Sequence, residues 1–375
     1  MNTVNTLIKW PGGKAREIKH IEHLIPKHER YVEPFFGGGA MFFYLNPRKA
    51  IINDISTNLI LFYRLVKEQN KDFEKYLRAY DTSFQDLLSS CDSRIDDILK
   101  VYLDLKSCNI SRDNAEERLK YVVDIVTKEA LKRVECELVP DCEALKEQLK
   151  LFALDKMERT IKNEEKKPFS DADLKENLIT GFTSGYYIYF RNVHNSIALN
   201  PKQYTDSPYN IANFYFIREY CYGSMFRYNS KGEFNIPYGG MSYNRKDFKG
   251  KIDNIFNADV KELFSGTKIS CSDFADFIAA HDLVETDFMF LDPPYDTNFS
   301  DYEGKDFTKN DQARLAEVLR NTKAKFILII KNTDFIYSLY EKDFNILCFD
   351  KTYTYNVRSR NERNVEHLII TNISV

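Results

Sequence analysis

The chain has 375 residues, of which 43% are hydrophobic and 14% aromatic, so it has ample material for a buried core and is not a disordered or low-complexity chain. No apolar run approaches the ~20 residues of a membrane-spanning helix, and we expect no signal peptide, no membrane association and a cytoplasmic location. Seven unclustered cysteines without a CxxC pair predict neither a zinc knuckle nor a disulfide framework. The formal net charge of −3 excludes a chain coated in basic charge but leaves room for a local basic groove.

Residues 1–80 alternate apolar runs with glycine-rich turns. Arg30–Glu33 is predicted to be a short strand, a tight turn follows at residues 36–40, and a helix is expected to begin within Ala40–Leu45. Residues 49–54 form a second apolar segment that ends in an acid. The order strand, glycine turn, helix, strand is typical of an α/β unit with a parallel sheet.

Residues 85–176 differ in character from the chain before them. They contain no glycine, and 17 Lys and Arg stand against 22 Asp and Glu, which makes the segment acidic. Its apolar residues recur at helical spacing. We therefore expect a mainly helical insertion, and its acidic charge makes it poorly suited to binding phosphate. It could enlarge the scaffold, bind a partner or extend the contact along nucleic acid.

Residues 180–251 are rich in Tyr, Phe, Asn and Gly. Within residues 218–251, 7 Lys and Arg exceed 3 Asp and Glu. Basic charge interleaved with aromatic and amide side chains suits nucleic acid. A polar, loop-rich domain whose basic residues only solvate one face is the alternative.

Residues 252–375 return to the α/β pattern, with predicted buried strands at residues 288–292 and 326–331, a helix at Lys309–Asn321 and a further strand at residues 366–371. Sheet-forming segments therefore lie at both ends of the chain. We expect three parts: an α/β domain of residues 1–80 and 252–375, a helical insertion of residues 81–179, and a small domain of residues 180–251.

The tetrapeptide Asp292-Pro293-Pro294-Tyr295 directly follows a predicted buried strand, where ligands bind in open α/β sheets. The prolines lack N–H donors, so we expect the carbonyls there to be left free for a ligand. Asp292 adds an acceptor and Tyr295 a stacking face. These groups match an exocyclic amine on a flat heterocycle, because Asp292 and the Pro293 carbonyl together can hold both amine hydrogens. A purely structural proline turn is the alternative.

A second motif, residues 33–39 (EPFFGGG), follows the first strand and precedes a helix. Its glycines allow the backbone to approach a ligand closely. The dinucleotide fingerprint is not met, because Phe42 stands at its third glycine position. Asp54 lies at the end of the next strand, where a carboxylate can hold ribose hydroxyls. A helix-capping or turn acid is the alternative for Asp54.

The third motif, residues 9–14 (KWPGGK), lacks the upstream glycine of a phosphate loop, and Ala15 replaces the Ser or Thr that would bind magnesium. We therefore do not expect a nucleoside triphosphate site. Trp10 beside a lysine could line a cofactor pocket or pack as an N-terminal clamp.

The order of these motifs resembles that of the Dam-type DNA adenine-N6 methyltransferases, in the arrangement with the cofactor region first. Residues 226–239 (FRYNSKGEFNIPYG) resemble that family's R-Y-N-x-x-G-E-F-N-V-P-F-G block, as do Phe307-Thr308 and Asp311-Gln312 after the tetrapeptide. The resemblance covers about residues 5–80 and 180–372. It implies a Rossmann-like methyltransferase sheet with helices on both faces, and S-adenosylmethionine (SAM) as the methyl donor without a metal.

The resemblance also implies roles for individual residues. The catalytic residues would be Asp292, Pro293 and Tyr295, and the residues against double-stranded DNA would be Arg227, Asn229, Lys231 and Pro237. The SAM-binding residues would be Trp10, Lys14, Phe35, Gly37, Gly39, Asp54, Asp273, Phe274 and Asp292, with Asp54 on the ribose and Phe274 stacked on the adenine.

An adenine inside a duplex must be flipped out to present its amine. Transfer then needs positioning of the amine against the methyl group more than it needs a strong base, and no cysteine follows a proline here, as carbon-5 cytosine methylation would require. The alternatives are methylation of the cytosine N4 amine, of RNA or of a protein amide, and a DNA-binding regulator without activity. A cognate restriction endonuclease, if there is one, would be encoded separately.

Overall fold

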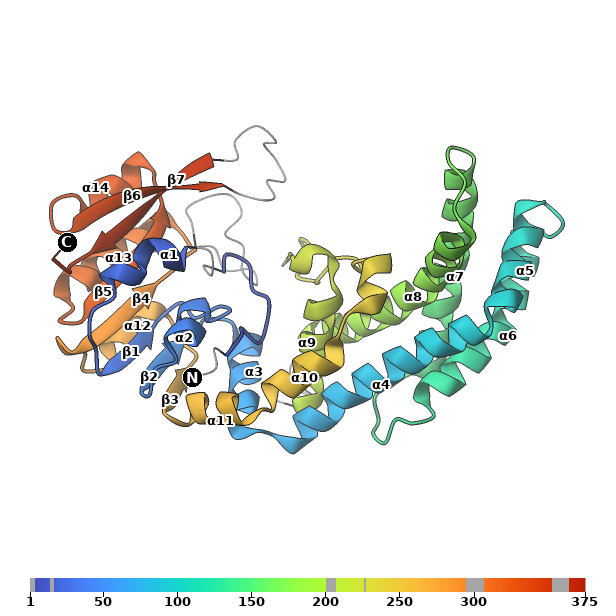
Figure 1. Cartoon of the computed structure of the whole chain (residues 1–375), viewed down its shortest axis with the longest axis horizontal. Helices are drawn as coiled ribbons and strands as arrows, with labels where there is room; N and C mark the ends of the chain where they lie inside the picture. The colour runs from blue at the N-terminus through green and yellow to red at the C-terminus, as the bar shows by residue number, and fades with distance from the viewer. Residues whose placement is uncertain are drawn as a thin grey trace. The chain divides into compact units, whose positions relative to one another are not determined.

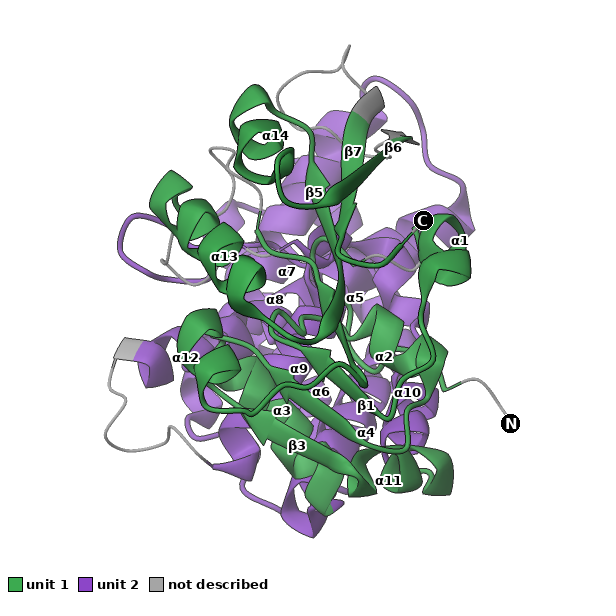
Figure 2. Ribbon diagram, turned by 90° about the vertical axis from the view of Figure 1, so that its left-hand side faces the viewer, with its two compact units in different colours: residues 1–68, 257–375 green, residues 69–256 purple. Residues whose placement is uncertain are grey.

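The computed structural model of the chain describes residues 4–13, 17–199, 207–225, 227–294, 307–352 and 364–374. The chain divides into two compact units, and Figure 2 distinguishes them by colour. Unit 1 comprises residues 1–68 and 257–375, and unit 2 comprises residues 69–256. The expected helical insertion and the expected small domain both fall within unit 2.

Unit 1 is built on a seven-stranded sheet with the order β3-β2-β1-β4-β5-β7-β6 (Figure 1). The strands are β1 (Arg30–Glu33), β2 (Ala50–Asn53), β3 (Thr267–Ser270), β4 (Asp287–Leu291), β5 (Lys325–Lys331), β6 (Asn345–Thr352) and β7 (Asn364–Thr371). Strands β1 to β5 pair in parallel, whereas β7 runs antiparallel between β5 and β6. Strands β3 and β6, which were not predicted from the sequence, form the two edges of the sheet and carry polar residues along with the apolar ones.

Helices cover both faces of this sheet, as the family resemblance implies. Alternate strand residues point to opposite faces, so Val32 and Met289 join one buried cluster, while Tyr31 and Phe288 contact each other on the other face. The first face is covered by α12 (Phe274–Ala279), α13 (Lys309–Asn321) and α14 (Asp334–Tyr340), whose apolar residues belong to that cluster.

The second face is covered by α2 (Ala40–Leu45), α3 (Thr57–Glu68) and α11 (Ala258–Ser265). Phe264 of α11 joins these helices, because its ring centroid lies 5.3 Å from that of Phe42 and 5.8 Å from that of Tyr63. The short helices α1 (Ile18–Ile21) and η1 (Glu22–Leu24) precede β1. The α/β part of the chain therefore has the three-layer architecture of a Rossmann-like methyltransferase.

The position of a binding site follows from the strand order. The chain builds outward from β1 through β2 to β3, and then returns to the other side of β1 to add β4 and β5. The direction of strand addition thus reverses between β1 and β4. Open α/β sheets bind ligands beyond the carboxyl ends of the strands at such a switch point.

Unit 2 is mainly helical (Figure 1). Its helices are α4 (Lys71–Ser93), α5 (Ile95–Lys106), α6 (Arg112–Leu131), α7 (Cys142–Glu164), α8 (Asp171–Leu199), α9 (Pro208–Tyr220), η2 (Tyr222–Ser224), η3 (Met241–Arg245) and α10 (Phe248–Ile255). Side-chain caps at Asn70, Ser111 and Asp141 satisfy backbone N–H groups at the starts of α4, α6 and α7. These caps explain why the segment forms separate helices between short connections.

Two glycines allow α8 to lie directly against α7. A Cβ atom on Gly181 would stand 2.8 Å from the Cα of Ala153, and one on Gly185 would stand 2.5 Å from the carbonyl oxygen of Gln148. Because the two glycines are four residues apart, they share one face of α8. The close approach of these helices therefore depends on the missing side chains.

The aromatic residues of segment 180–220 are placed differently from the expectation. Those of α8 and α9 are buried in the core of unit 2, where Phe216 contacts Tyr80, Tyr186 and Phe190 with ring centroids 4.7 to 5.8 Å apart. Their packing against α4 uses the faces that nucleic acid would need for stacking. Most of the aromatic content that suggested a nucleic-acid surface therefore serves the core of unit 2.

Candidate active site

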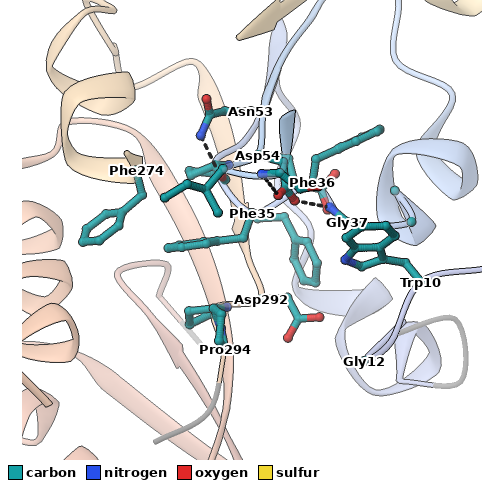
Figure 3. A pocket seen from close by; sticks show the side chains of 18 of the residues that line it. Trp10, Gly12, Phe35, Phe36, Gly37, Asn53, Asp54, Phe274, Asp292 and Pro294 are labelled. Atoms are coloured by element: carbon teal, nitrogen blue, oxygen red, sulfur yellow. Dashed lines mark hydrogen bonds between the residues drawn. The ribbon is translucent and has the colours of Figure 1, made fainter. Parts of the chain in front are cut away.

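A cavity of about 410 Å³ lies at the carboxyl edge of the sheet in unit 1 (Figure 3). It is formed by the segment before α1, the turns after β1 and β2, the segment after β3 and the residues after β4. Trp10, Asp54 and Asp292, which come from widely separated parts of the chain, all line it. The other lining residues with predicted roles are Phe35, Gly37, Gly39, Asp273, Phe274 and Pro293.

The glycine turn after β1 forms one wall of this cavity. Gly37 and Gly39 have φ angles of +50° and +66°, in the left-handed region that side chains disfavour. A Cβ atom on Gly37 would stand 2.9 Å from Cδ1 of Trp10, and one on Gly38 would stand 3.3 Å from its Cβ. The indole of Trp10 thus lies directly on the turn, so the two N-terminal motifs form one structure.

Asp54 is held by the backbone on both of its carboxylate oxygens. The N–H of Gly37 donates to Oδ2 at 2.8 Å, and the N–H of Ser56 donates to Oδ1 at 2.9 Å. Burial raises the pKa of Asp54, while these backbone hydrogen bonds act in the opposite direction. The carboxylate is therefore fixed in place at the cavity wall.

Asn53, the last residue of β2, joins three strand ends and was missed by the sequence analysis. Its Nδ2 donates to the carbonyls of Pro34 and Ser272, both at 3.0 Å, and its Oδ1 accepts from the N–H of Ser272 at 3.0 Å. The side chain is almost fully buried. It therefore ties the segments that follow β1 and β3 to the end of β2.

Glu33, the last residue of β1, is the third carboxyl group at this edge. Only 2% of it is exposed, and Oε2 accepts a hydrogen bond of 2.8 Å from the hydroxyl of Tyr31. Burial raises the pKa of Glu33 well above its ordinary value, and the charges of Asp292 and Asp54 raise it further. Glu33 has no predicted role of its own, although its position in the EPFFGGG motif is a usable signal.

The residues after β4 are positioned by a side chain from α13. Nε2 of Gln312, a fully buried residue, donates to the Pro294 carbonyl at 3.0 Å. The expectation that the carbonyls of this turn are left free is thus wrong for Pro294, because α13 places the amide of Gln312 within hydrogen-bonding distance of its carbonyl. Among the described residues, none donates to the Pro293 carbonyl.

Asp273 and Phe274 lie at the start of α12. The carboxylate of Asp273 accepts from the N–H of Ala275 at 2.9 Å and from Nη2 of Arg314 at 2.7 Å. The ring of Phe274 is 5.4 Å from that of Phe35 and 5.6 Å from that of Phe307. Figure 3 shows Phe274 and Trp10 toward opposite ends of the cavity, with Phe35 and Phe36 between them.

The remaining residues with predicted roles fall outside the cavity or outside the described residues. Lys14 and Tyr295 belong to the segments that the structure does not describe. Arg227, Asn229, Lys231 and Pro237 lie in unit 2, between α9 and α10.

The loop that carries these four residues is organised by Asn229. Its Oδ1 accepts from the N–H groups of Lys231 and Glu233, and its Nδ2 donates to the Glu233 carboxylate at 2.8 Å. A bridge between Tyr228 and Phe234 closes the turn. Arg227, Lys231 and Pro237 are exposed, whereas the Asn229 side chain is engaged in the turn.

In the described part of the chain, no helix has both the length and the apolar character needed to cross a membrane. Nor do the described residues contain a group of three or more His, Cys, Asp or Glu side chains that could hold a metal ion.

The sequence matches the family described as D12 class N6 adenine-specific DNA methyltransferase over residues 10–103 and 125–355. Among individual relatives, it is 24% identical over 373 residues to the type II methyltransferase M.CviBI of Paramecium bursaria Chlorella virus NC1A, with 98% of each chain covered. It is 28% identical over 362 residues to the type II methyltransferase M.MjaIII of Methanocaldococcus jannaschii, with 92% of this chain and 90% of the relative covered.

A third relative is the DNA adenine methylase of Salmonella typhi, 23% identical over 341 residues, with 89% of this chain and 82% of the relative covered. The family match includes residues 85–103 and 125–176, so most of the helical segment that we expected to lie outside the resemblance belongs to the family pattern. Family and relatives agree on the chemistry that the strand-edge motifs predict. The chain is an enzyme that methylates the N6 amine of adenine in DNA, and it belongs to the D12 class of N6 adenine-specific DNA methyltransferases.

Proposed function

We propose that the cavity of unit 1 binds SAM, and that the target adenine is a flipped-out base of duplex DNA. The observation that carries this proposal is the convergence of Trp10, Asp54 and Asp292 on one cavity of about 410 Å³. The smaller cavity in unit 2 differs, because Glu233 is its single carboxyl group and Phe234 its single aromatic residue.

The residues present fit the cofactor that the family implies. The carboxyl groups of Asp54 and Asp292 favour a ligand that carries positive charge and hydroxyl groups. A side chain at Gly37 would collide with Trp10, so the bare turn lets the indole lie against it as one wall of the cavity. We propose that Asp54 holds the ribose, that Phe35 and Phe274 contact the adenine of SAM, and that Trp10, Lys14, Gly37, Gly39 and Asp273 complete the site.

In the proposed mechanism, Asp292 and the Pro293 carbonyl accept the two hydrogens of the adenine N6 amine. The nitrogen then approaches tetrahedral geometry, and its lone pair points away from both acceptors. When bound, SAM would supply an electrophilic methyl group and leave as a neutral thioether. The methylated nitrogen loses one hydrogen as a proton, which Asp292, as its hydrogen-bond acceptor, can take up. Correct positioning within ~3–3.5 Å accounts for most of the acceleration, because the attack needs no covalent enzyme intermediate. Tyr295 is proposed to stack on the flipped base, whose extrusion costs a few kcal/mol.

For DNA we propose that Arg227 and Lys231 contact phosphates, since both side chains are exposed on one short loop. Asn229 and Pro237 then act by shaping that loop against the duplex. We propose residues 180–251 as the target-recognition domain, residues 81–179 as a helical insertion, and residues 1–80 and 252–375 as the catalytic domain. Relatives that are named type II methyltransferases support a cognate restriction endonuclease encoded separately.

The test is to express the protein in cells that lack adenine methylation and to map modified adenines by single-molecule sequencing. We expect N6-methyladenine at one short sequence, and calorimetry should detect SAM binding to the purified protein. Binding that survives unchanged when Trp10 and Asp54 are both replaced by Ala would contradict the proposed SAM site. Methylation restricted to single-stranded DNA would contradict the proposed duplex substrate.

A further inference from the structure

We propose that one polar face of α8 positions the DNA-contacting loop, through Tyr187, Arg191 and Asn195. The inference rests on the proposed function, because it assumes that the loop of residues 227–237 contacts DNA. It concerns residues that neither the family resemblance nor the motifs point to, and all of them lie within unit 2.

The three residues are spaced by four along α8, so they lie on one face of the helix. Each reaches a backbone carbonyl of the loop. The hydroxyl of Tyr187 donates to Ile236 at 2.9 Å, and Nη1 of Arg191 donates to the same oxygen at 3.3 Å. One turn further on, Nδ2 of Asn195 donates to the carbonyl of Phe234 at 3.0 Å.

Asn195 makes the strongest of these attachments because it holds both backbone groups of one residue. Its Oδ1 also accepts from the N–H of Phe234, at 2.8 Å. The side-chain amide thus pairs with Phe234 as a neighbouring strand would. The Phe234 side chain is 1% exposed and lies near the ring of Tyr228, so the same residue is anchored on its side-chain face too.

The backbone of the loop makes few strand-like pairings of its own. Only the isolated bridges between Tyr228 and Phe234, and between Cys221 and Tyr238, pair its backbone among the described residues. Asn229 shapes the tip but belongs to the loop itself. The loop is therefore attached at two places: its end, at residues 237–239, is hydrogen-bonded to the backbone of Tyr220 and Tyr222 at and just after the end of α9, and residues 234–236 are held by the side chains of α8. The exposed residues Arg227 and Lys231 lie on the loop before the segment that α8 holds.

A polar cavity of about 260 Å³ lies between α8 and the loop, and it invites interpretation as a ligand site. Its amide groups argue against that interpretation. The donors and acceptors of Asn195 and Asn229, which line it, are engaged with the loop. The attachment of the loop thus accounts for these amide groups, whereas Nε of Arg191, which also lines the cavity, is buried without a hydrogen-bond partner among the described residues.

The attachment has a specific kinetic consequence. A loosened loop must be ordered when DNA binds, which lowers affinity without altering the chemistry in the bound complex. The KM for DNA should therefore rise, while kcat at saturating DNA and the affinity for SAM should change little. Discrimination against a duplex with one altered base pair should also fall, since a mobile loop accepts more arrangements.

The test compares Asn195→Ala, Asn195→Asp and Tyr187→Phe with Asn192→Ala, an exposed neighbour on α8. We expect Asn195→Ala to raise the KM for the mapped duplex about 10-fold, since two hydrogen bonds are lost. Asn195→Asp should be at least as impaired, because a carboxylate cannot donate to the Phe234 carbonyl. Tyr187→Phe should show a smaller rise, and Asn192→Ala should behave as the wild type.

Two results would overturn the inference. One is an unchanged KM and an unchanged discrimination ratio in Asn195→Ala. The other is a fall in kcat or in SAM affinity as large as the change in KM, which would indicate a general folding role. Lys231→Ala separates this inference from the proposed function. If Lys231→Ala leaves DNA binding and its salt dependence intact, the proposal that the loop contacts DNA fails. If Lys231→Ala weakens DNA binding while Asn195→Ala does not, only the positioning role of α8 fails.

Discussion

The two units of this enzyme hold their functional groups by different physical means. In unit 1, Glu33, Asn53 and Leu291 end neighbouring strands of a parallel sheet, so backbone pairing brings the residues after them together. In unit 2, side chains of α8 reach across to the backbone of a loop that has almost no sheet of its own.

The difference teaches where sensitivity to mutation should lie. The carboxyl edge of the sheet holds the residues that follow its strands close to one another. As a consequence, Glu33 and Asp54 are buried near each other, and their pKa values are raised. A helix that holds a loop through side chains leaves its functional residues exposed, and single side chains then carry the positioning. Changes in unit 1 should therefore alter chemistry, and changes in unit 2 should alter DNA binding or stability.

The sharpest test of the first half of this comparison is Asp292→Ala. Because its carboxylate is proposed to accept one hydrogen of the target amine, we expect kcat to fall at least about 100-fold. Asp276→Ala, which removes an exposed carboxylate from α12, is the control. Single-turnover methylation of the mapped duplex measures the effect, with circular dichroism to confirm folding; an active Asp292→Ala enzyme refutes the role.

The packing of unit 2 is tested by Gly185→Val. A side chain there would meet the Gln148 carbonyl, so α8 must move away from α7. We expect a loss of about 1–3 kcal/mol in the free energy of unfolding, as for other overpacked sites. Lys175→Ala on the exposed side of α8 should cost little. Denaturant unfolding measures both, and equal stability of Gly185→Val and wild type would show that the close approach is dispensable.

Gln312→Ala tests whether the hydrogen bond from α13 to the residues after β4 matters for catalysis. Without the amide, the Pro294 carbonyl loses its donor, and the adjacent Pro293 carbonyl is held less firmly. We expect kcat to fall about 10-fold, equivalent to about 1.4 kcal/mol, while the KM for DNA stays constant. Asn310→Ala, an exposed residue of the same helix, is the control. A change confined to the KM for DNA would argue against this role.

The buried acid of unit 1 predicts a pH effect on stability. The folded-state pKa of Glu33 is raised, so folding favours its protonated form. The stability contribution is fully present below the unfolded pKa of about 4.5 and is lost as the pH rises toward the folded value. Glu33→Gln should therefore gain thermal stability relative to the wild type between pH 5 and pH 8. Glu29→Gln removes an exposed carboxylate as the control, and a parallel pH profile for Glu33→Gln and wild type would contradict the prediction.

Unit 2 predicts a smaller effect of opposite sign through His194. This residue is 3% exposed, and burial together with the charge of Arg218 lowers its pKa to about 4. Folding thus favours neutral His194, and its contribution is present above the unfolded pKa of about 6.5 and lost as the pH falls through about 4. His194→Leu should be less sensitive to acid between pH 6.5 and pH 4 in a thermal melt. Identical acid profiles would show that His194 is not titrating there.

Much of unit 1 was predictable from local sequence. The strand at Arg30–Glu33 and the helix at Lys309–Asn321 agree with the structure in their bounds, and a helix begins at Ala40 as expected, because apolar periodicity and flanking turns are local signals. The choice of adenine over cytosine came from the order of motifs and is confirmed by the family. The edge strands β3 and β6 were missed because polar residues on an edge blur the alternation that marks a strand.

The burial of aromatic residues in unit 2 was not predictable from composition. Tyr186 and Phe216 could have served a DNA surface or a core, and only the packing of α8 and α9 against α4 assigns them to the core. The glycines of α8 likewise gain their meaning from α7.

Sequence by itself determined the family and which chemical groups stand at the ends of the strands: a carboxylate after an apolar strand, a glycine turn and an ordered set of motifs are properties of neighbouring residues. Only the tertiary structure decided which residues hold these groups in position. Asn53 and Ser272 are 219 residues apart, yet they are hydrogen-bonded because β2 and β3 are neighbours in the sheet. Gln312 meets Pro294 and Asn195 meets Phe234 for the same reason, since such partners are set by the arrangement of elements in space and leave no pattern in the local sequence.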